Sequence, residues 1–172
     1  MNNVKIIDDF LPQKEFESLQ KYIVWNYEFP MYFHNKVAYG DERVRNWNWY
    51  ATHIMMVRGQ PCSESYYSLV SQLFFPRFVG LGLSEVSRIK VNFYPYTPRL
   101  KEHDNHTDRE FGKMAAIFGL NTCNGFTRIK GSGKIKSVEN RLFIFDGIQL
   151  HNSSTTSAVS YTHLTLPTIC SV

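Results

Sequence analysis

The amino-acid sequence predicts a mainly β domain of the α+β class, a sandwich or jelly-roll barrel with N-terminal helices packed outside. Apolar residues recur at helical spacing in the first half of the chain, and short segments of strand length separated by tight turns follow from residue 88. A chain of 172 residues, 43% hydrophobic and 15% aromatic, can bury a core of its own. The same composition excludes a disordered chain, a collagen-like repeat and a coiled coil.

The first residues predict a short strand over 4–7 and then a helix. Asp8 and Asp9 are the expected helix caps, and Pro12 is the expected first-turn proline. An apolar stripe at three- and four-residue spacing follows, made of Phe16, Leu19, Ile23 and Val24.

Residues 26–50 are aromatic and irregular, and we expect strands with connecting loops there. Their large rings could form a substrate wall, but core packing is favoured because large aromatics dominate protein interiors. These rings are Tyr32, Phe33, Trp47, Trp49 and Tyr50. Beyond them, apolar residues at helical spacing over 63–78 predict a second helix that ends near Pro76.

From residue 88 the apolar residues alternate with a period of two, which is typical of strands. Over Arg88–Tyr94, one face carries Ile89, Val91 and Phe93, and the other carries Lys90, Asn92 and Tyr94. Gly131–Gly133 predicts a tight hairpin. Further strands are expected over 114–120, 126–130, 134–138 and 141–145. The sequence contains no internal repeat or linker, so residues 1–158 are predicted to form one domain.

Cysteine usage and charge limit the possible partners. Cys62, Cys123 and Cys170 form no CxxC pair, so neither a disulfide framework nor a cysteine zinc site is expected. No apolar run is long enough for a membrane span and no signal segment opens the chain, which predicts a cytoplasmic protein, or host-cytoplasmic if viral. Residues 88–141 carry 11 basic and 5 acidic side chains. That excess suits an anionic ligand, such as a dicarboxylate or a nucleic-acid backbone, and on charge alone a solvated basic hairpin is an equally good explanation.

The C-terminal stretch VSYTHLTLPT, residues 159–168, matches the in-frame translation of a transposase-type sequencing adapter. We interpret residues 159–172 as an adapter scar that replaces the native C-terminus. The segment is therefore expected to pack poorly compared with 141–145, and His163 and Cys170 are not taken as ligands. The alternative is a genuine polar strand, because YTHLTL alternates between apolar and polar residues.

The sequence His106-Thr107-Asp108 carries the clearest chemical signal. Residues two apart in an extended segment point to the same face, so both side chains can reach one metal ion. His151 follows another predicted strand and completes a set of two imidazoles and one carboxylate. This set is the facial triad of non-haem Fe(II) oxygenases, which leaves coordination positions open. The remaining candidates, His34, His53 and His103, are assigned to ordinary hydrogen-bonding roles.

The run from about residue 88 to 156 resembles the 2-oxoglutarate- and Fe(II)-dependent oxygenases of the prolyl 4-hydroxylase-like type, including small phage-associated members. The matching pieces are RIKVNFYPYTP, HTD, AAIFGLNTCNGF, KGSGKIKSVENRLFIFDG and LHNSSTT, and IIDDFLPQKEFESLQ resembles the usual entry to this fold. The resemblance covers nearly all of residues 1–158. It implies a double-stranded β-helix with iron on His106, Asp108 and His151, and 2-oxoglutarate in contact with Tyr94.

This resemblance implies a dioxygenase that hydroxylates an unactivated C–H bond and releases succinate and CO2. The implied cofactor is Fe(II) and the implied cosubstrate is 2-oxoglutarate, with ascorbate as a further reductant. The residues do not identify the substrate: peptidyl proline, another protein side chain, a nucleotide or a free small molecule is compatible with them, and a protein side chain or a small molecule is the expected partner. Neither a nucleic acid nor a membrane is expected as a partner.

Two departures from the family pattern put the activity of the chain in doubt. The family places a basic residue, usually Arg, about nine or more residues after the distal His, but no Arg or Lys follows Arg141 here. We attribute the missing Arg to replacement of the native C-terminus. A second family tyrosine that contacts 2-oxoglutarate is also absent, since AIFGLN has Phe118 and Gly119 in that strand.

Three alternatives remain open at this point. The basic second half and the aromatic residues would suit a nucleic-acid demethylase of the same metal chemistry, although neither an Arg-rich substrate loop nor a base-stacking lid is evident. A non-catalytic jelly-roll module, either binding or phage structural, would carry the HTD sequence as surface decoration. A cupin-like metalloenzyme without 2-oxoglutarate would need more histidines than the chain offers.

Overall fold

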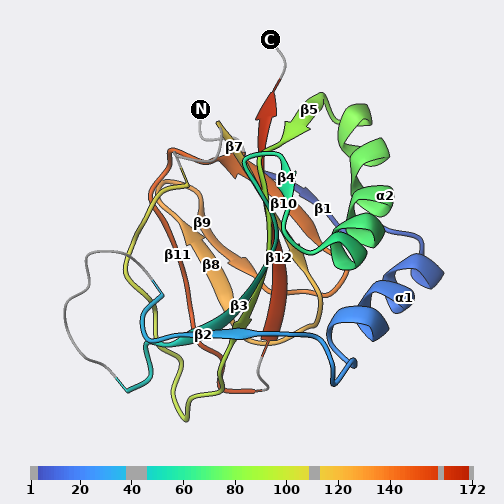
Figure 1. Cartoon of the computed structure of the whole chain (residues 1–172). Coiled ribbons are helices and arrows are strands. Elements are labelled where there is room, and N and C mark those ends of the chain that lie inside the picture. The colour runs from blue at the N-terminus through green and yellow to red at the C-terminus, as the bar shows by residue number, and fades with distance from the viewer. Residues whose placement is uncertain (1–3, 38–45, 109–112, 159–160, 171–172) are drawn as a thin grey trace.

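The computed structural model describes residues 4–37, 46–108, 113–158 and 161–170. Two antiparallel sheets make up most of the molecule, and two helices cover the outer face of the larger sheet (Figure 1). The helices are α1, Gln13–Ile23, and α2, Glu64–Gly80. The strands are β1 Lys5–Ile7, β2 Tyr32–His34, β3 Tyr50–Val57, β4 Gln60–Pro61, β5 Leu83–Val86, β6 Arg88–Tyr94, β7 Met114–Gly119, β8 Phe126–Ile129, β9 Gly133–Lys136, β10 Leu142–Asp146, β11 His151–Ser153 and β12 Tyr161–Cys170.

The larger sheet has the strand order β1-β10-β7-β12-β6-β3-β2. Outside this order, β4 pairs with β3 and β5 pairs with β12. The smaller sheet has the order β11-β8-β9. All paired strands within both sheets are antiparallel. This arrangement confirms the predicted mainly β class with a jelly-roll architecture and external helices.

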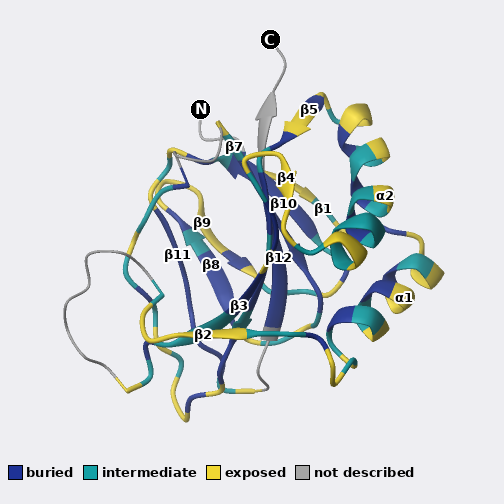
Figure 2. Ribbon diagram, viewed as in Figure 1, coloured by how far each residue is buried: buried dark blue, intermediate teal, exposed yellow. Residues whose placement is uncertain are grey.

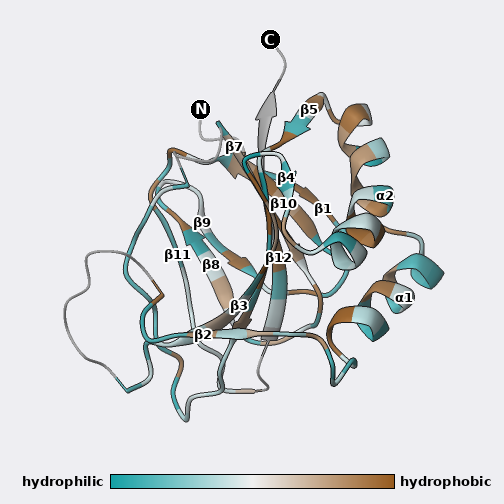
Figure 3. Cartoon of the chain, in the orientation of Figure 1, coloured by the Kyte–Doolittle hydropathy of each residue, from teal (hydrophilic) through white to brown (hydrophobic). Residues whose placement is uncertain are grey.

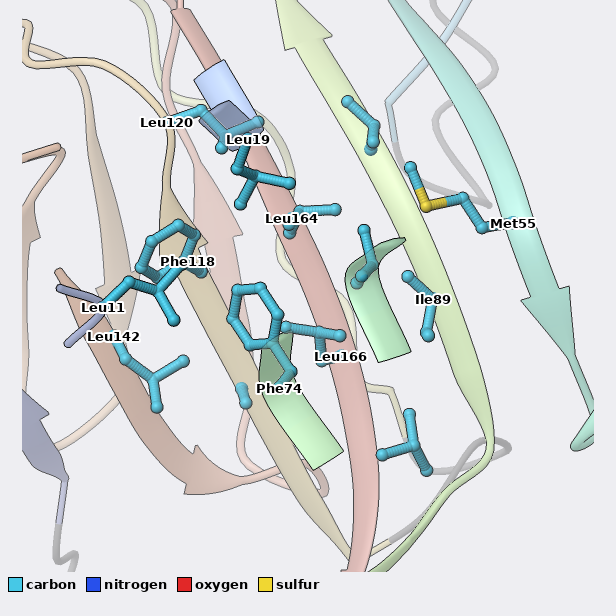
Figure 4. Close-up of a cluster of buried hydrophobic side chains, with 14 of the residues drawn as sticks. Leu11, Leu19, Met55, Phe74, Ile89, Phe118, Leu120, Leu142, Leu164 and Leu166 are labelled. Carbon is cyan, nitrogen blue, oxygen red and sulfur yellow. The ribbon is translucent and has the colours of Figure 1, made fainter. Parts of the chain in front are cut away.

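The main core lies between the helices and the larger sheet. Phe118 from β7 makes edge contacts with Phe16 of α1 and Phe74 of α2, at ring-centroid distances of 6.0 and 5.0 Å. Ile89 and Leu164 join them from β6 and β12, and all these side chains are buried (Figure 2; Figure 4). Full burial of such side chains stabilises a fold by about 1.5–3 kcal/mol each. The helices are consequently held by their apolar faces (Figure 3).

Strand β6 is buried on both faces, which the alternating pattern alone did not predict. Ile89 and Val91 belong to the core under the helices, as expected for the apolar face. The opposite face is polar, yet Arg88, Asn92 and Tyr94 on it are also buried. This polar face lines the space between the two sheets.

The helices differ from the sequence prediction in two details. Pro12 itself occupies the N-cap of α1 without a side-chain hydrogen bond, and Asp8 instead accepts hydrogen bonds from Arg141. Helix α2 continues through Pro76 to Gly80, because the burial of Phe74 and Phe78 compensates for the backbone hydrogen bond that proline removes. Neither of the described helices is long and apolar enough to cross a membrane.

Strand β3 was not predicted as an individual element, because a bulge interrupts its alternation. The register with β6 shifts between Ile54 and Met56, so Met55 and Met56 are both buried although they are neighbours in sequence. The bulge hides the two-residue period that would mark a strand.

The expectation that residues 159–172 pack poorly is wrong for the described part of that segment. Strand β12 lies between β6 and β7 and pairs with both. Its alternation places Leu164 and Leu166 in the core and directs His163 and Thr165 into the space between the sheets. Its apolar side chains thus face the core and its polar side chains face the space between the sheets, and its backbone joins β6 to β7 in the larger sheet. The adapter interpretation of its origin stays a prediction.

Gly119 is required at the end of β7 by a close backbone approach. A Cβ atom at this position would overlap the carbonyl oxygen of Val138. We expect Gly119→Ala to lower the free energy of unfolding by about 2 kcal/mol, measured by chemical denaturation. The matched control is Gly80→Ala, where a Cβ would meet no atom within 4 Å. Equal losses in the two variants would contradict this explanation.

Candidate metal centre

A backbone bridge brings the two histidines of the predicted triad together. The His106 amide donates to the His151 carbonyl at 2.9 Å, and the His151 amide donates to the His106 carbonyl at 3.0 Å. Two residues further on, the Asp108 amide donates to the Gly147 carbonyl at 2.9 Å. Residues distant in sequence therefore face one another, and the potential ligand atoms of His106, Asp108 and His151 all lie within 4.8 Å of one another.

The His151 ring is oriented by contacts on two sides. Its Nδ1 lies 2.9 Å from the Gln149 carbonyl oxygen, to which it can only donate a hydrogen bond. Nε2 is then left as the free lone pair, 3.6 Å from Asp108 Oδ2. The ring of Phe145 packs edge-on against the imidazole at 4.9 Å and shields it from water. Such outer contacts set the tautomer of a metal-binding histidine.

The two oxygens of Asp108 have different surroundings. Arg88 donates from Nη2 to Oδ1 at 2.9 Å, whereas Oδ2 faces His151. Burial alone raises the pKa of this carboxyl, but the adjacent His151 imidazole and the charge of Arg88 hold it well below its usual range. Asp108 is therefore an ionised carboxylate with one oxygen available to a cation.

The electrostatics of His106 also suit metal binding. Burial, together with the neighbouring His151, lowers the pKa of His106 to about 4. The imidazole is consequently neutral near pH 7, as a metal ligand must be. Two imidazole nitrogens and one carboxylate, without a thiolate in the group, fit Fe(II) and leave open coordination positions.

A polar pocket between the sheets opens onto the triad. It contains about 420 Å³ of space free of protein atoms, part of it open to solvent. Tyr94 lies on its wall, stacked against Tyr50 at a ring-centroid distance of 5.8 Å. Burial raises the pKa of the Tyr94 phenol, so this group stays protonated and can donate a hydrogen bond. The pocket is thus adjacent to both the triad and the predicted ligand-contacting tyrosine.

Sequence reasoning missed the polar side chains of β6 as pocket residues. Arg88, Lys90 and Asn92 line the pocket together with Tyr94. Asn92 donates from Nδ2 to Thr165 Oγ1 at 2.9 Å, and the same nitrogen lies 3.1 Å from His163 Nε2. Burial and the charge of Arg88 lower the pKa of Lys90 to about 8. The sequence signal that could have identified these pocket residues is the period of two, because it places them on the same face of β6.

The other predicted histidine roles agree with the structure. His34 lies 2.8 Å from Thr52 Oγ1, His53 lies 2.8 Å from the Pro30 carbonyl oxygen, and His103 lies 2.9 Å from Ser153 Oγ. None of the three belongs to the His–Asp–His group found among the described residues. These histidines are therefore available as controls.

The aromatic residues of the 26–50 segment do not all fill the core. Tyr32 and Phe33 are 63% and 67% exposed, so the preference for core packing is wrong for these two. Strand β2 lies at an end of the larger sheet, and within the described part of the chain no further strand pairs with its outer edge. In β7, Phe118 packs under the helices and Ile117 faces the pocket, so no tyrosine from these positions reaches the triad.

The Arg88–Asp108 pair should be important for the metal-free protein. Arg88→Met leaves a buried carboxylate without its cation, so we expect the free energy of unfolding to fall by about 3 kcal/mol. Mn(II) should restore more stability to this variant than to the unmodified chain, because the metal compensates the same charge. Thermal unfolding with and without Mn(II) measures both effects.

Arg77→Met is the control for this experiment. Arg77 of α2 pairs with Glu15 of α1, and both side chains are partly exposed. Its loss should cost at most about 1 kcal/mol. A stability loss in Arg88→Met that Mn(II) does not reduce would show that Asp108 is not a metal ligand.

Comparisons with known proteins agree with this geometry. A prolyl hydroxylase from Trichoplax adhaerens, solved with a hypoxia-inducible-factor peptide fragment, has a TM-score of 0.69 at 15% identity, over 96% of this chain and 83% of that chain. A viral collagen prolyl hydroxylase from Paramecium bursaria Chlorella virus-1, solved with 2-oxoglutarate, has a TM-score of 0.58 at 13% identity, over 95% and 93%.

The non-haem, α-ketoglutarate-dependent epimerase SnoN of nogalamycin biosynthesis has a TM-score of 0.62 at 8% identity, over 96% of this chain and 79% of that chain. No family model and no curated protein sequence matches the chain. The chain therefore has the fold shared by prolyl hydroxylases and other 2-oxoglutarate- and Fe(II)-dependent oxygenases.

Proposed function

We propose that the chain is an Fe(II)- and 2-oxoglutarate-dependent dioxygenase that hydroxylates an unactivated C–H bond. The observation that carries this proposal is the convergence of His106, Asp108 and His151 at a polar pocket inside the barrel. The shared fold supports it, because the structural neighbours include 2-oxoglutarate-dependent oxygenases. Both the metal chemistry and the cosubstrate follow from the same site.

The proposed roles divide between ligands and supporting residues. His106, Asp108 and His151 would hold the Fe(II), which with 2-oxoglutarate and O2 supplies the oxidising chemistry and yields succinate and CO2. Arg88 keeps Asp108 ionised and oriented, and Phe145 limits water at His151. Tyr94 would donate a hydrogen bond to 2-oxoglutarate. The protein thereby positions the reactants and excludes water, which are its main contributions in such sites.

A protein side chain, such as peptidyl proline, is the proposed substrate class. Two of the structural neighbours are prolyl hydroxylases, one of them solved with a peptide fragment. An open groove also lies beside the pocket, lined by Trp47, Trp49 and Tyr96 with basic Arg99 and Lys101 at its side. Trp47 contacts His103 at a ring-centroid distance of 5.8 Å, and His103 in turn contacts Tyr94. An extended peptide in this groove would therefore approach the triad.

Ascorbate is proposed only as an auxiliary reductant.

An anaerobic titration with Fe(II) and 2-oxoglutarate tests the proposal directly. We expect a visible charge-transfer band of the chelated keto acid in the full chain. His106→Ala should abolish the band, because it removes one of three ligands. His34→Ala should retain it, since His34 lies on β2 and bonds only to Thr52 among the described contacts. A band of full intensity in His106→Ala would require a different ligand set.

A further inference from the structure

The pocket beside the triad contains a cation that no described carboxylate neutralises. Arg88 and Lys90 both extend from β6 into this pocket. The guanidinium of Arg88 already pairs with Asp108 at 2.9 Å. Among the residues that the structure describes, no carboxylate oxygen lies within 4.0 Å of Lys90 Nζ. Among the described residues of the pocket, Lys90 is therefore the cation that no carboxylate contacts.

The negative charge of Asp108 acts on Lys90 from beyond contact distance, and the other described surroundings of Lys90 supply polar support. Its ammonium lies 5.5 Å from the centre of the Tyr50 ring, and its backbone position faces Thr165 of β12. Asn92, the next residue on the same face, bonds to the Thr165 hydroxyl. A desolvated cation costs free energy unless an anion balances it. Such a site favours an anionic ligand over a neutral one.

The position of Lys90 relative to the triad defines what kind of anion fits. Lys90 stands two residues beyond Arg88 on one strand face, which separates their Cα atoms by about 7 Å. Arg88 marks the metal end of the pocket through its bond to Asp108. A ligand that touches both ends therefore has one group at the triad and an anionic group separated from it by a short chain. A five-carbon dicarboxylate matches that length.

We propose that Lys90 binds the distal carboxylate of a dicarboxylate 2-oxo acid whose keto-acid end is chelated at the triad. This inference rests on the proposed function and deepens it, because it makes Lys90 the residue that selects a dicarboxylate over a monocarboxylate cosubstrate. The cation comes from β6, before the HTD sequence, and not from the strand after the distal histidine.

Matched keto acids test the assignment. 2-Oxopentanoate has the five-carbon chain of 2-oxoglutarate without the distal carboxylate. The full chain is loaded with Fe(II) anaerobically and titrated with each acid, and the charge-transfer band gives both dissociation constants. We expect 2-oxoglutarate to bind about 100-fold more tightly than 2-oxopentanoate. Lys90→Met should reduce this ratio to about fivefold or less and leave 2-oxopentanoate affinity unchanged.

Two further measurements separate binding from folding. The Fe(II) affinity of Lys90→Met, measured without keto acid, should be no weaker than that of the unmodified chain, which shows that the triad is intact. Lys90→Arg keeps the charge and should retain most of the discrimination. If Lys90→Met does not fold, loss of discrimination in Lys90→Gln with retention in Lys90→Arg gives the same answer.

The contrary outcomes are distinct. Full discrimination in Lys90→Met would overturn the assignment and point to another cation, first of all Arg88. Equal weakening of both keto acids would show a structural effect and also overturn it. If the unmodified chain binds Fe(II) but gives no band with either acid, the proposed function itself fails. If it gives equal bands with both, only the selectivity proposal fails.

Discussion

The burial of a polar strand face is the constraint on which the rest of the structure depends. Strand β6 packs Ile89 and Val91 under the helices, and its other face directs Arg88 and Asn92 into the barrel. A buried polar group without a partner costs about 1–3 kcal/mol, so this face is tolerated only where partners are built around it. The ion pair to Asp108 and the hydrogen bond to Thr165 supply such partners to Arg88 Nη2 and to the Asn92 amide nitrogen. The functional pocket and the stability of the sheet therefore involve the same residues.

The triad is assembled mainly by backbone geometry. The reciprocal hydrogen bonds between His106 and His151 connect a loop after β6 to the first residue of β11. Alternation then sets Asp108 on the same side as His106, and the Gly147 carbonyl holds its backbone. Side-chain contacts refine this arrangement without creating it. A substitution of a ligand side chain therefore removes the metal site while leaving the connection between the two sheets in place.

The sequence predicted those features that depend on local period or on short spacing. The alternation of 88–94 identified β6 and its two faces, and the HTD spacing identified two residues of the triad. It did not reveal that the polar face is buried, because period alone does not say what covers a strand. Strand β3 was not predicted because its bulge makes Met55 and Met56 consecutive buried residues. The N-cap of α1 was misassigned because Asp8 has a long-range partner in Arg141, which no local pattern contains.

The alternation of apolar and polar residues in strand β12 matches the position of this strand in the larger sheet. Its alternation suits a place between β6 and β7, with apolar residues toward the helices and His163 toward the pocket. Burial lowers the pKa of His163 to about 3, so this strand adds no positive charge to the pocket near pH 7.

Among the described pocket residues, the formal charges belong to Asp108, which is negative, and to Arg88 and Lys90, which are positive. A divalent cation entering alone would be repelled by Lys90, and a dicarboxylate entering alone would lack its chelating centre. The dicarboxylate would neutralise Lys90, and the metal ion would supply the chelating centre. The charges of the pocket therefore favour binding of the metal ion and the dicarboxylate together. Each ligand would thus bind less favourably when the other is absent. Metal occupancy and cosubstrate occupancy of the pocket would therefore be coupled.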